Sequence, residues 1–590
     1  MARPHTAAQP APAGRRPPGP KGLPLLGSAL DFRRDPLRTF VRAWRDHGDL
    51  VRFRGPVPVV LVTHPDDLQH ILADNFANYP HPDDFNRKVA VSVGQGLVTT
   101  EGEVWRAQRR TVAPSFRREP LERFAGVMAD SAARMLDRWD RVARYRQVID
   151  ARTEMQSLTL EILARCLFRA DWSSSARELG DAVAAQLEHI NGKLIAVADI
   201  PESVPTPRNR RFRAARKVLD DTVHRLIAER RRLPAGGEAD DLLSSLMRAP
   251  DPETGRLMTD EQLRDQVVTL FIAGHETVAA TLSWICHLLS TRPAETERAR
   301  EEVLRVLGDR PPTMEDLPQL KYLKLFIQEA LRLYPPLWQV ARMPLRDDVL
   351  SGYHIPAGSF LLLSTYITHR NPEFWDNPEG FDPERFTRER SAGRPRYAYV
   401  PYVGGPRNCV GLAFANMELT IVVASMLQRF RLEMVPGHPV VMQPDISLRA
   451  KYGIRMTLRP VEAVGASSPV PAPRPAADVP SAGCPVAHGP SAGDSAPAPA
   501  ATAATELGPA VSDSAPEVSG RGAEEASARG ALELSAEPSG APGALSCPYA
   551  PPAAAAGESG RSDALIRAPD GRLREPQPAI RQSWNHLTGR

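Results

Sequence analysis

The sequence predicts a mainly α-helical fold with small β-sheets, followed by a disordered C-terminal tail. The chain has 590 residues, of which 42% are apolar, so it can bury a large core. Most periodic segments before residue 460 follow helical spacing, and only a few short runs are typical of strands. After about residue 461, Pro, Ala, Ser, Gly and Glu dominate and leave little to bury. We therefore expect a disordered Pro/Arg-rich segment at residues 1–21, a folded unit at 22–460 and a disordered tail at 461–590.

The expected elements begin with short strands at residues 50–53 and 57–62, followed by a helix over 65–74. Thr259 and Gln262 form a capping-box pattern, after which apolar residues lie almost all round a helix of roughly 30 residues that should cross the core. A second helix over 320–333 should stop before Pro335. Residues 353–358 followed by 360–363 are expected to form a hairpin, and 412–430 another helix.

Charge and cysteine content exclude several classes of protein. Lys and Arg number 74 against 70 Asp and Glu, too balanced for nucleic acid or an anionic membrane as the main partner. Five scattered cysteines argue against a disulfide framework and fit a reducing cytosol. Residues 1–21 contain neither the apolar stretch of a signal peptide nor a membrane anchor. We expect a cytoplasmic protein.

The most informative segment is a glycine-rich loop around one cysteine, over residues 402–411. It reads Tyr-Val-Gly-Gly-Pro-Arg-Asn-Cys-Val-Gly and precedes a helical pattern. Glycines let backbone N–H groups point at the sulfur of Cys409, and a helix N-terminus favours its negative charge, so the loop can present a thiolate to a metal. Arg407 is placed to meet a carboxylate. Cys166 and Cys286 lie in apolar helical patterns and are expected to be buried core residues.

The loop resembles the haem-binding segment of the cytochrome P450 family. The residues that carry the resemblance are Tyr402, Gly405, Arg407, Cys409 and Gly411. It implies the P450 fold, with a long central helix over haem b and Cys409 as the axial ligand of the haem iron. Tyr402 stands where the family usually has Phe.

Two further segments match the family in order. Glu329 and Arg332 lie three apart on the second helix, and Arg385 lies in the run Pro-Glu-Arg-Phe over 383–386. The resemblance implies a Glu–Arg–Arg network that holds the haem loop in place. Such an acid–base pair alone is a weak signal, because similar pairs occur on many solvated helices.

The haem carboxylates need hydrogen-bond donors. Trp105 and Arg109 lie four apart on one expected helix, and Arg342 follows Pro335 by seven residues. The resemblance assigns these three residues and Arg407 to the haem propionates. The alternative for Trp105 and Arg109 is a basic surface helix with one core tryptophan.

The long helix contains Ala-Gly-His-Glu-Thr over residues 273–277. Gly274 costs helix stability, so it needs a reason. One reading is structural: Gly274 allows close packing and Thr277 bonds back to a carbonyl. The resemblance implies instead a local opening of the helix, where Glu276 and Thr277 relay protons as general acids. His275 is given no chemical role.

Together these matches imply a monooxygenase that inserts one oxygen atom from O2 into an apolar small molecule. The tail holds only Cys484 and Cys547, too few for an iron–sulfur ferredoxin, so electrons from NAD(P)H are expected through a separate ferredoxin and its reductase. Alternatives are a peroxygenase or isomerase on the same fold, or a non-catalytic haem-binding sensor or scaffold. The tail could bind an unidentified protein. Nothing in the expected pocket selects a particular substrate.

Overall fold

The computed structural model describes residues 14–23, 27–55, 58–168, 176–194, 200–232, 241–251 and 253–461. The expected disorder over residues 1–13 and 462–590 lies outside these residues. The helices are α1 (Ala29–Arg34), α2 (Pro36–His47), α3 (Pro65–Gln69), α4 (Asp83–Val93), α5 (Gly102–Val112), α6 (Arg118–Arg144), α7 (Ala151–Phe168), α8 (Ala176–Leu194), α9 (Pro207–Arg231), α10 (Leu242–Arg248), α11 (Asp260–Thr291), α12 (Pro293–Leu307), α13 (Lys321–Leu333), α14 (Thr365–Thr368), α15 (Arg388–Ser391) and α16 (Leu412–Arg429). The strands are β1 (Leu50–Phe53), β2 (Val59–Val62), β3 (Ile149–Asp150), β4 (Val340–Arg342), β5 (Asp348–Leu350), β6 (Tyr353–Ile355), β7 (Phe360–Leu363), β8 (Phe430–Met434), β9 (Met442–Pro444), β10 (Leu448–Ala450) and β11 (Arg455–Pro460).

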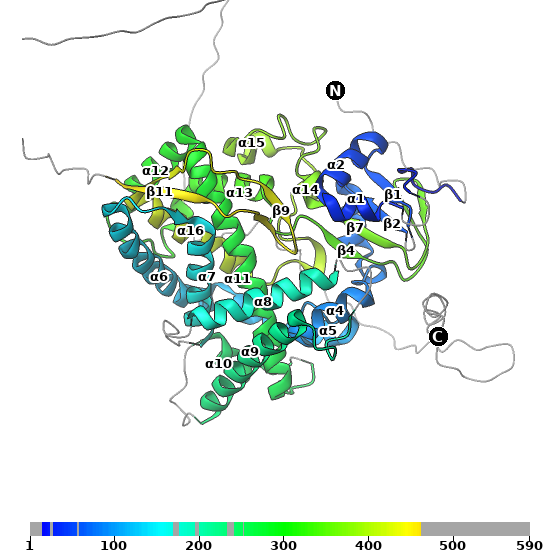
Figure 1. Ribbon diagram of the computed structural model, residues 1–590, viewed down its shortest axis with the longest axis horizontal. Helices are drawn as coiled ribbons and strands as arrows, with labels where there is room; N and C mark the ends of the chain where they lie inside the picture. The colour runs from blue at the N-terminus through cyan, green and yellow to red at the C-terminus, as the bar shows by residue number, and fades with distance from the viewer. Residues whose placement is uncertain are drawn as a thin grey trace, which may run out of the picture. The chain divides into compact units, whose positions relative to one another are not determined.

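Helix α11 is the centre of the folded unit. It starts where the sequence predicts, because the backbone N–H of Gln262 donates to Thr259 Oγ1 at 3.3 Å and the Thr259 N–H donates to Gln262 Oε1 at 3.0 Å. Among the described helices it alone is long and apolar enough to span a membrane, but most of it is buried against other helices. That burial is what a core helix shows. Helices α7 and α16 pack against it, and α6 packs in turn on both of them (Figure 1).

A four-stranded sheet in the order β1-β2-β7-β4 forms the other side of the unit, beside α1 and α2 (Figure 1). The predicted strand over 50–53 is confirmed as β1, and the one over 57–62 is confirmed from Val59 on as β2, while residue 57 lies outside the described residues; the two strands pair antiparallel with Leu50 opposite Val62. β2 then pairs in parallel with β7, and β7 pairs antiparallel with β4. The first strands of the unit therefore depend on strands about 300 residues later.

The expected hairpin between residues 353–358 and 360–363 is wrong. β6 pairs antiparallel with the preceding strand β5, with Leu350 opposite Tyr353, and β7 joins the four-stranded sheet instead. The two-residue turn consists of Ser351 at φ 45° and Gly352 at φ 77°, both in the left-handed region that tight hairpin turns require. The Ser-Gly turn thus closes a hairpin one strand earlier than the Pro-Ala-Gly segment.

Candidate active site

The loop that carries Cys409 is held in an unusual backbone conformation. Val403 has φ 62°, which is strained for a β-branched residue, and Gly405 has φ 68°. A Cβ at Gly405 would overlap the carbonyl oxygen of Leu72, so glycine is required there. The N–H of Cys409 donates to the carbonyl of Tyr402 at 3.0 Å and closes the loop. The Tyr402 hydroxyl donates to Asn416 Oδ1 of α16 at 2.9 Å, which gives tyrosine a partner that phenylalanine would leave unused.

Cys409 combines deep burial with an accessible surface. Burial raises the pKa of its thiol, while the Gly411 N–H, which donates to the sulfur, and the nearby Arg109 charge lower it. Cys409 nevertheless has an exposed surface, as has Ala273 in the middle of α11. A residue that is desolvated by protein yet accessible lines an interior space. Cys166 and Cys286 are buried, and burial raises the pKa of each.

The structure brings Glu329, Arg332 and Arg385 together in the core. Arg332 Nε donates to Glu329 Oε2 at 2.7 Å, and Arg385 Nε donates to Oε1 at 3.0 Å. All three side chains are at most 2% exposed. The guanidiniums also donate to backbone carbonyls, Arg332 to His369 and Gly380 among others. One carboxylate and a ring of carbonyls therefore satisfy two buried cations.

His369 connects this network to the Cys409 loop and was not singled out by any motif. Its carbonyl accepts from Arg332, and its Nε2 accepts the N–H of Val400 at 2.9 Å, just before the loop. Burial, with Arg332 and Arg370 nearby, lowers the pKa of His369 to about 3. The ring is thus neutral and free to accept. A histidine in an ordinary loop carries no sequence signal for such a role.

Two of the predicted haem-carboxylate donors already have partners in the protein. Arg109 donates to the Asn408 carbonyl at 3.0 Å and to its Oδ1 at 2.8 Å, so α5 is fastened to the Cys409 loop. Arg407 pairs with Glu101 and lies 4.3 Å above the Trp105 ring, which is 6% exposed.

Glu101 carries a second, unforeseen contact, since it lies 2.8 Å from His81 Nδ1. Burial, then the charge of Arg342, lowers the pKa of His81 to about 4. Neither residue stands in a motif: Glu101 was missed because its partner Arg407 lies about 300 residues away in sequence, and His81 because its partner is Glu101.

Arg342 differs from these cations, because no carboxylate of the described residues contacts it. Arg342 is 3% exposed, and its guanidinium donates to the carbonyl of Ala341 at 2.7 Å. Burial, then Arg407, lowers its pKa to about 10. A buried cation without a carboxylate, close to Arg407 of the Cys409 loop, together with an accessible thiol in that loop, fits a group with anionic arms and a metal that binds sulfur. The residues present therefore fit the haem that the resemblance implies, with Cys409 as ligand and Arg342 toward a carboxylate.

Glu276 and Thr277 are neighbours on α11, but their side chains bond to different groups. Thr277 Oγ1 donates to the Ala273 carbonyl at 2.9 Å, while Glu276 Oε1 accepts from Ser447 Oγ at 2.7 Å. α11 is an unbroken α-helix from Asp260 to Thr291, so the expected local opening is not present in it. The structural reading of this segment is observed at both residues. Thr277 bonds back to a carbonyl of its own helix. Gly274 allows close packing, since a Cβ there would press on Leu163 of α7 at 3.3 Å.

Two neighbouring residues complete this part of α11. His275 Nδ1 lies 2.8 Å from Thr159 Oγ1 in the core. Ser447, buried beside Glu276, was not foreseen.

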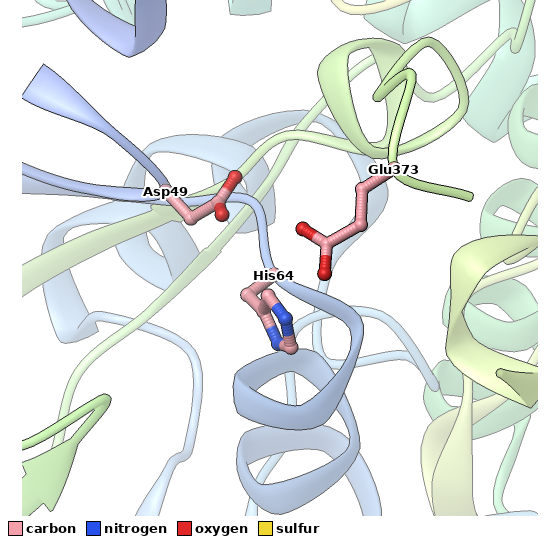
Figure 2. A group of neighbouring side chains, drawn as sticks. All are labelled: Asp49, His64 and Glu373. Atoms are coloured by element: carbon pink, nitrogen blue, oxygen red, sulfur yellow. The ribbon is translucent and has the colours of Figure 1, made fainter. Parts of the chain in front are cut away.

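A second cluster of possible ligands lies away from Cys409. Figure 2 shows Asp49, His64 and Glu373 with their ligand atoms within 4.8 Å of one another. Asp49 Oδ1 already accepts from Trp44 Nε1 at 2.8 Å, and His64 Nδ1 accepts the N–H of Asp66 at 3.2 Å. These bonds engage Asp49 with Trp44 of α2 and His64 with the first turn of α3.

Comparison with known proteins agrees with this geometry. The cytochrome P450 family model matches residues 17–456. Cyclooctatin synthase of Streptomyces melanosporofaciens is 36% identical over 451 residues, which are 76% of this chain and 97% of that protein. Cyclooctat-9-en-7-ol 5-monooxygenase of the same organism is 35% identical over 425 residues, 71% of this chain and 90% of that protein. Pentalenene oxygenase of Streptomyces avermitilis is 35% identical over 434 residues, 73% of this chain and 92% of that protein.

Among solved structures, retinoic acid-bound cyanobacterial CYP120A1 superimposes with a TM-score of 0.68 and 25% identity, covering 76% of this chain and 99% of that one. The match by family model, by relatives over most of their length and by structure spans the unit that holds the Cys409 loop. The chain belongs to the cytochrome P450 family, and it is a monooxygenase that uses haem b, O2 and electrons that originate from NAD(P)H.

Proposed function

We propose that this enzyme hydroxylates an apolar, terpene-type molecule. The observation that carries the proposal is the Cys409 sulfur, which receives the Gly411 N–H and borders an interior space. Support for the substrate class comes from relatives named for pentalenene and cyclooctat-9-en-7-ol. When bound, the haem supplies oxygen activation. The protein residues bind it, exclude water and supply protons.

Each site residue has a proposed task. Cys409 ligates the iron as thiolate, and Arg342, with Trp105, Arg109 and Arg407, holds the haem carboxylates. Arg342 is the one with a free charge to offer, while Arg109 and Arg407 act partly by fastening α5 to the loop. Gly405, Gly411 and Tyr402 keep the loop in the shape that aims the sulfur.

Proton supply is assigned to α11. The Thr277 hydroxyl can give up its hydrogen bond to the Ala273 carbonyl and donate one instead to an oxygen atom on the substrate side of the haem. Glu276 is the acid that returns a proton to Thr277. Thr277→Ala should lower product formed per NAD(P)H several-fold and raise hydrogen peroxide, without altering the absorption spectrum. Equal product per NAD(P)H in the variant and the wild type contradicts the relay.

Electrons are proposed to come from a separate ferredoxin and its reductase in the cytoplasm. Helix α5 borders the Cys409 loop through Arg109 and exposes Arg106, and Arg117 and Arg118 follow on the surface. An acidic partner would be attracted to these cations. The rate of electron transfer should therefore fall steeply with ionic strength.

The first test is spectroscopic. The reduced, carbon-monoxide-bound protein should show a strongly red-shifted Soret band that is lost in Cys409→Ser, while Cys166→Ser, which changes a buried cysteine, retains it. Polycyclic terpene hydrocarbons and alcohols should then shift the spin state of the haem iron at micromolar concentration. Failure of every such compound, with fatty acids binding instead, would refute the substrate class and leave the haem-thiolate assignment standing.

A further inference from the structure

A cavity lies between helices α8 and α9, which pack side by side (Figure 1). Its volume is about 260 Å³, which is room for about nine water molecules at the roughly 30 Å³ that each occupies in the liquid. Its wall is formed by Ala185, Glu188 and His189 of α8 and by Pro207, Arg208 and Arg211 of α9. The cavity is thus built by two helices and takes no residue from α11 or from the Cys409 loop.

His189 lines this cavity as a buried imidazole. It is 2% exposed, and within the described part of the chain neither of its ring nitrogens makes a hydrogen bond. Its Nε2 lies 3.7 Å from Glu202 Oε1, which is beyond hydrogen-bond reach, and Glu202 pairs with Lys193 instead. The imidazole stacks on the Phe212 ring with the two centroids 3.8 Å apart, which fixes its plane. A buried N–H of this kind is costly unless a ligand or a water accepts from it.

Arg208 places a fixed positive charge at the same cavity. Its Nη2 donates to the carbonyls of Glu188 at 3.1 Å and His189 at 2.8 Å. Gly192 makes this position possible, because a Cβ there would overlap the guanidinium. No carboxylate among the described residues pairs with Arg208, so its charge is available to an anion. Burial, then the charge of Arg208, lowers the pKa of His189, so the ring is neutral and offers one N–H.

Two further features of α9 favour a negative charge in the cavity. The helix begins at Pro207, so its N-terminus, with the positive end of the helix dipole, lies at the cavity wall. Arg211 adds a second cation. It pairs with Glu188, but the two side chains are 63% and 64% exposed, and such exposed pairs contribute little. Arg211 can therefore turn to a bound anion at small cost.

We propose that this cavity is a second ligand site, which binds a small organic carboxylate separately from the molecule oxidised at the haem. The carboxylate lies between Arg208 and His189, since a planar guanidinium fits it with two parallel hydrogen bonds and the imidazole donates a third. The carbon skeleton of the ligand contacts Ala185 and Pro207, the apolar part of the wall. Because the ligand contacts α8 and α9 together, its binding strengthens the packing of the two helices.

The test uses the full-length, haem-loaded protein and benzoate as the probe, since benzoate has about nine non-hydrogen atoms and so matches the volume of the cavity. Isothermal titration calorimetry measures the binding, and benzamide serves as the neutral compound of the same shape. Benzoate should bind at one site with a Kd of about 1 mM, and benzamide at least about tenfold more weakly. The haem Soret band should not move when benzoate binds.

Two variants remove the proposed donors separately. Arg208→Gln removes the charge, and His189→Phe keeps a ring against Phe212 but loses the N–H. Each should weaken benzoate binding at least about fivefold. Arg213→Gln is the matched control, because Arg213 is an exposed arginine of the same helix outside the cavity wall, and it should leave the Kd unchanged. Arg208 is exposed as well, so a difference between the two arginine variants does not come from misfolding.

Three results would overturn the proposal. Equal binding of benzoate and benzamide would refute the anion site, as would an unchanged Kd in Arg208→Gln. Inorganic phosphate that binds as tightly as benzoate would refute the organic ligand, because the carbon skeleton would then contribute nothing. A benzoate-induced shift of the Soret band that persists in Arg208→Gln would place the binding at the haem. None of these results bears on the terpene-type substrate, so the proposed function is tested separately.

Discussion

Glu329→Gln is the most direct test of how the Cys409 loop is supported. Glu329 accepts from Arg332 Nε, Arg332 Nη2, Arg385 Nε and the Asp382 N–H, all between 2.7 and 3.0 Å. A glutamine keeps the shape but removes the only negative charge of the buried cluster and turns an NH2 group toward a guanidinium. Breaking such a pair costs about 3–5 kcal/mol. That is a large part of the about 5–15 kcal/mol by which domains are stable.

The assay is urea unfolding followed by tryptophan fluorescence and by the haem Soret band. Trp375, 1% exposed and 5.2 Å from the Arg332 guanidinium, should report the loss locally. The matched control is Glu384→Gln. Glu384 precedes Arg385 and pairs with Arg298, and both side chains of that ion pair are about half exposed. Exposed pairs contribute about 0.2–1 kcal/mol. If Glu329→Gln costs no more than this control, the network does not hold the loop, and its role in haem retention is refuted.

Three further predictions concern single residues. Gly405→Ala should cost at least about 1–3 kcal/mol and lower haem content, because a Cβ meets the Leu72 carbonyl, whereas Gly393→Ala, with similar positive φ but open space, should retain haem. Arg342→Gln should speed haem transfer to apomyoglobin by about tenfold or more, and an unchanged transfer rate would remove Arg342 from the haem carboxylates. Burial lowers the pKa of His275 to about 4, so below about pH 6.5 the unfolded chain binds more protons than the folded one and the free energy of unfolding falls on acidification. His275→Gln should remove about 2 kcal/mol of the stability that the wild type loses between pH 7.5 and 5. An unchanged pH dependence of unfolding would show that His275 is not buried and neutral.

Local signals in the sequence were sufficient where the structure is made by neighbours in the chain. The capping box at Thr259 sets the start of α11, and the 3.6-residue pattern sets its burial. The same reasoning failed at residues 353–363, because strand partners are chosen by the sheet and not by the segment itself. The Ser351-Gly352 turn competed successfully with the glycine turn at 358.

Site residues divide in the same way. Cys409, Gly405 and Arg407 lie in one loop whose spacing carries the chemistry. Ser447, in contrast, meets Glu276 across 171 residues of sequence, and no local pattern marks it. Such partners are selected by packing of α11 against β10, which the sequence alone does not locate.

The parallel pairing of β2 with β7 has a consequence for synthesis on the ribosome. β2 emerges with an apolar edge, Val59–Val62, whose partner Phe360–Leu363 follows roughly 300 residues later. At about 5–20 residues per second, that edge waits roughly 15–60 s for its neighbour. An unpaired apolar edge is a template for aggregation. Slow translation or a short supply of chaperones should therefore lower the yield of folded enzyme.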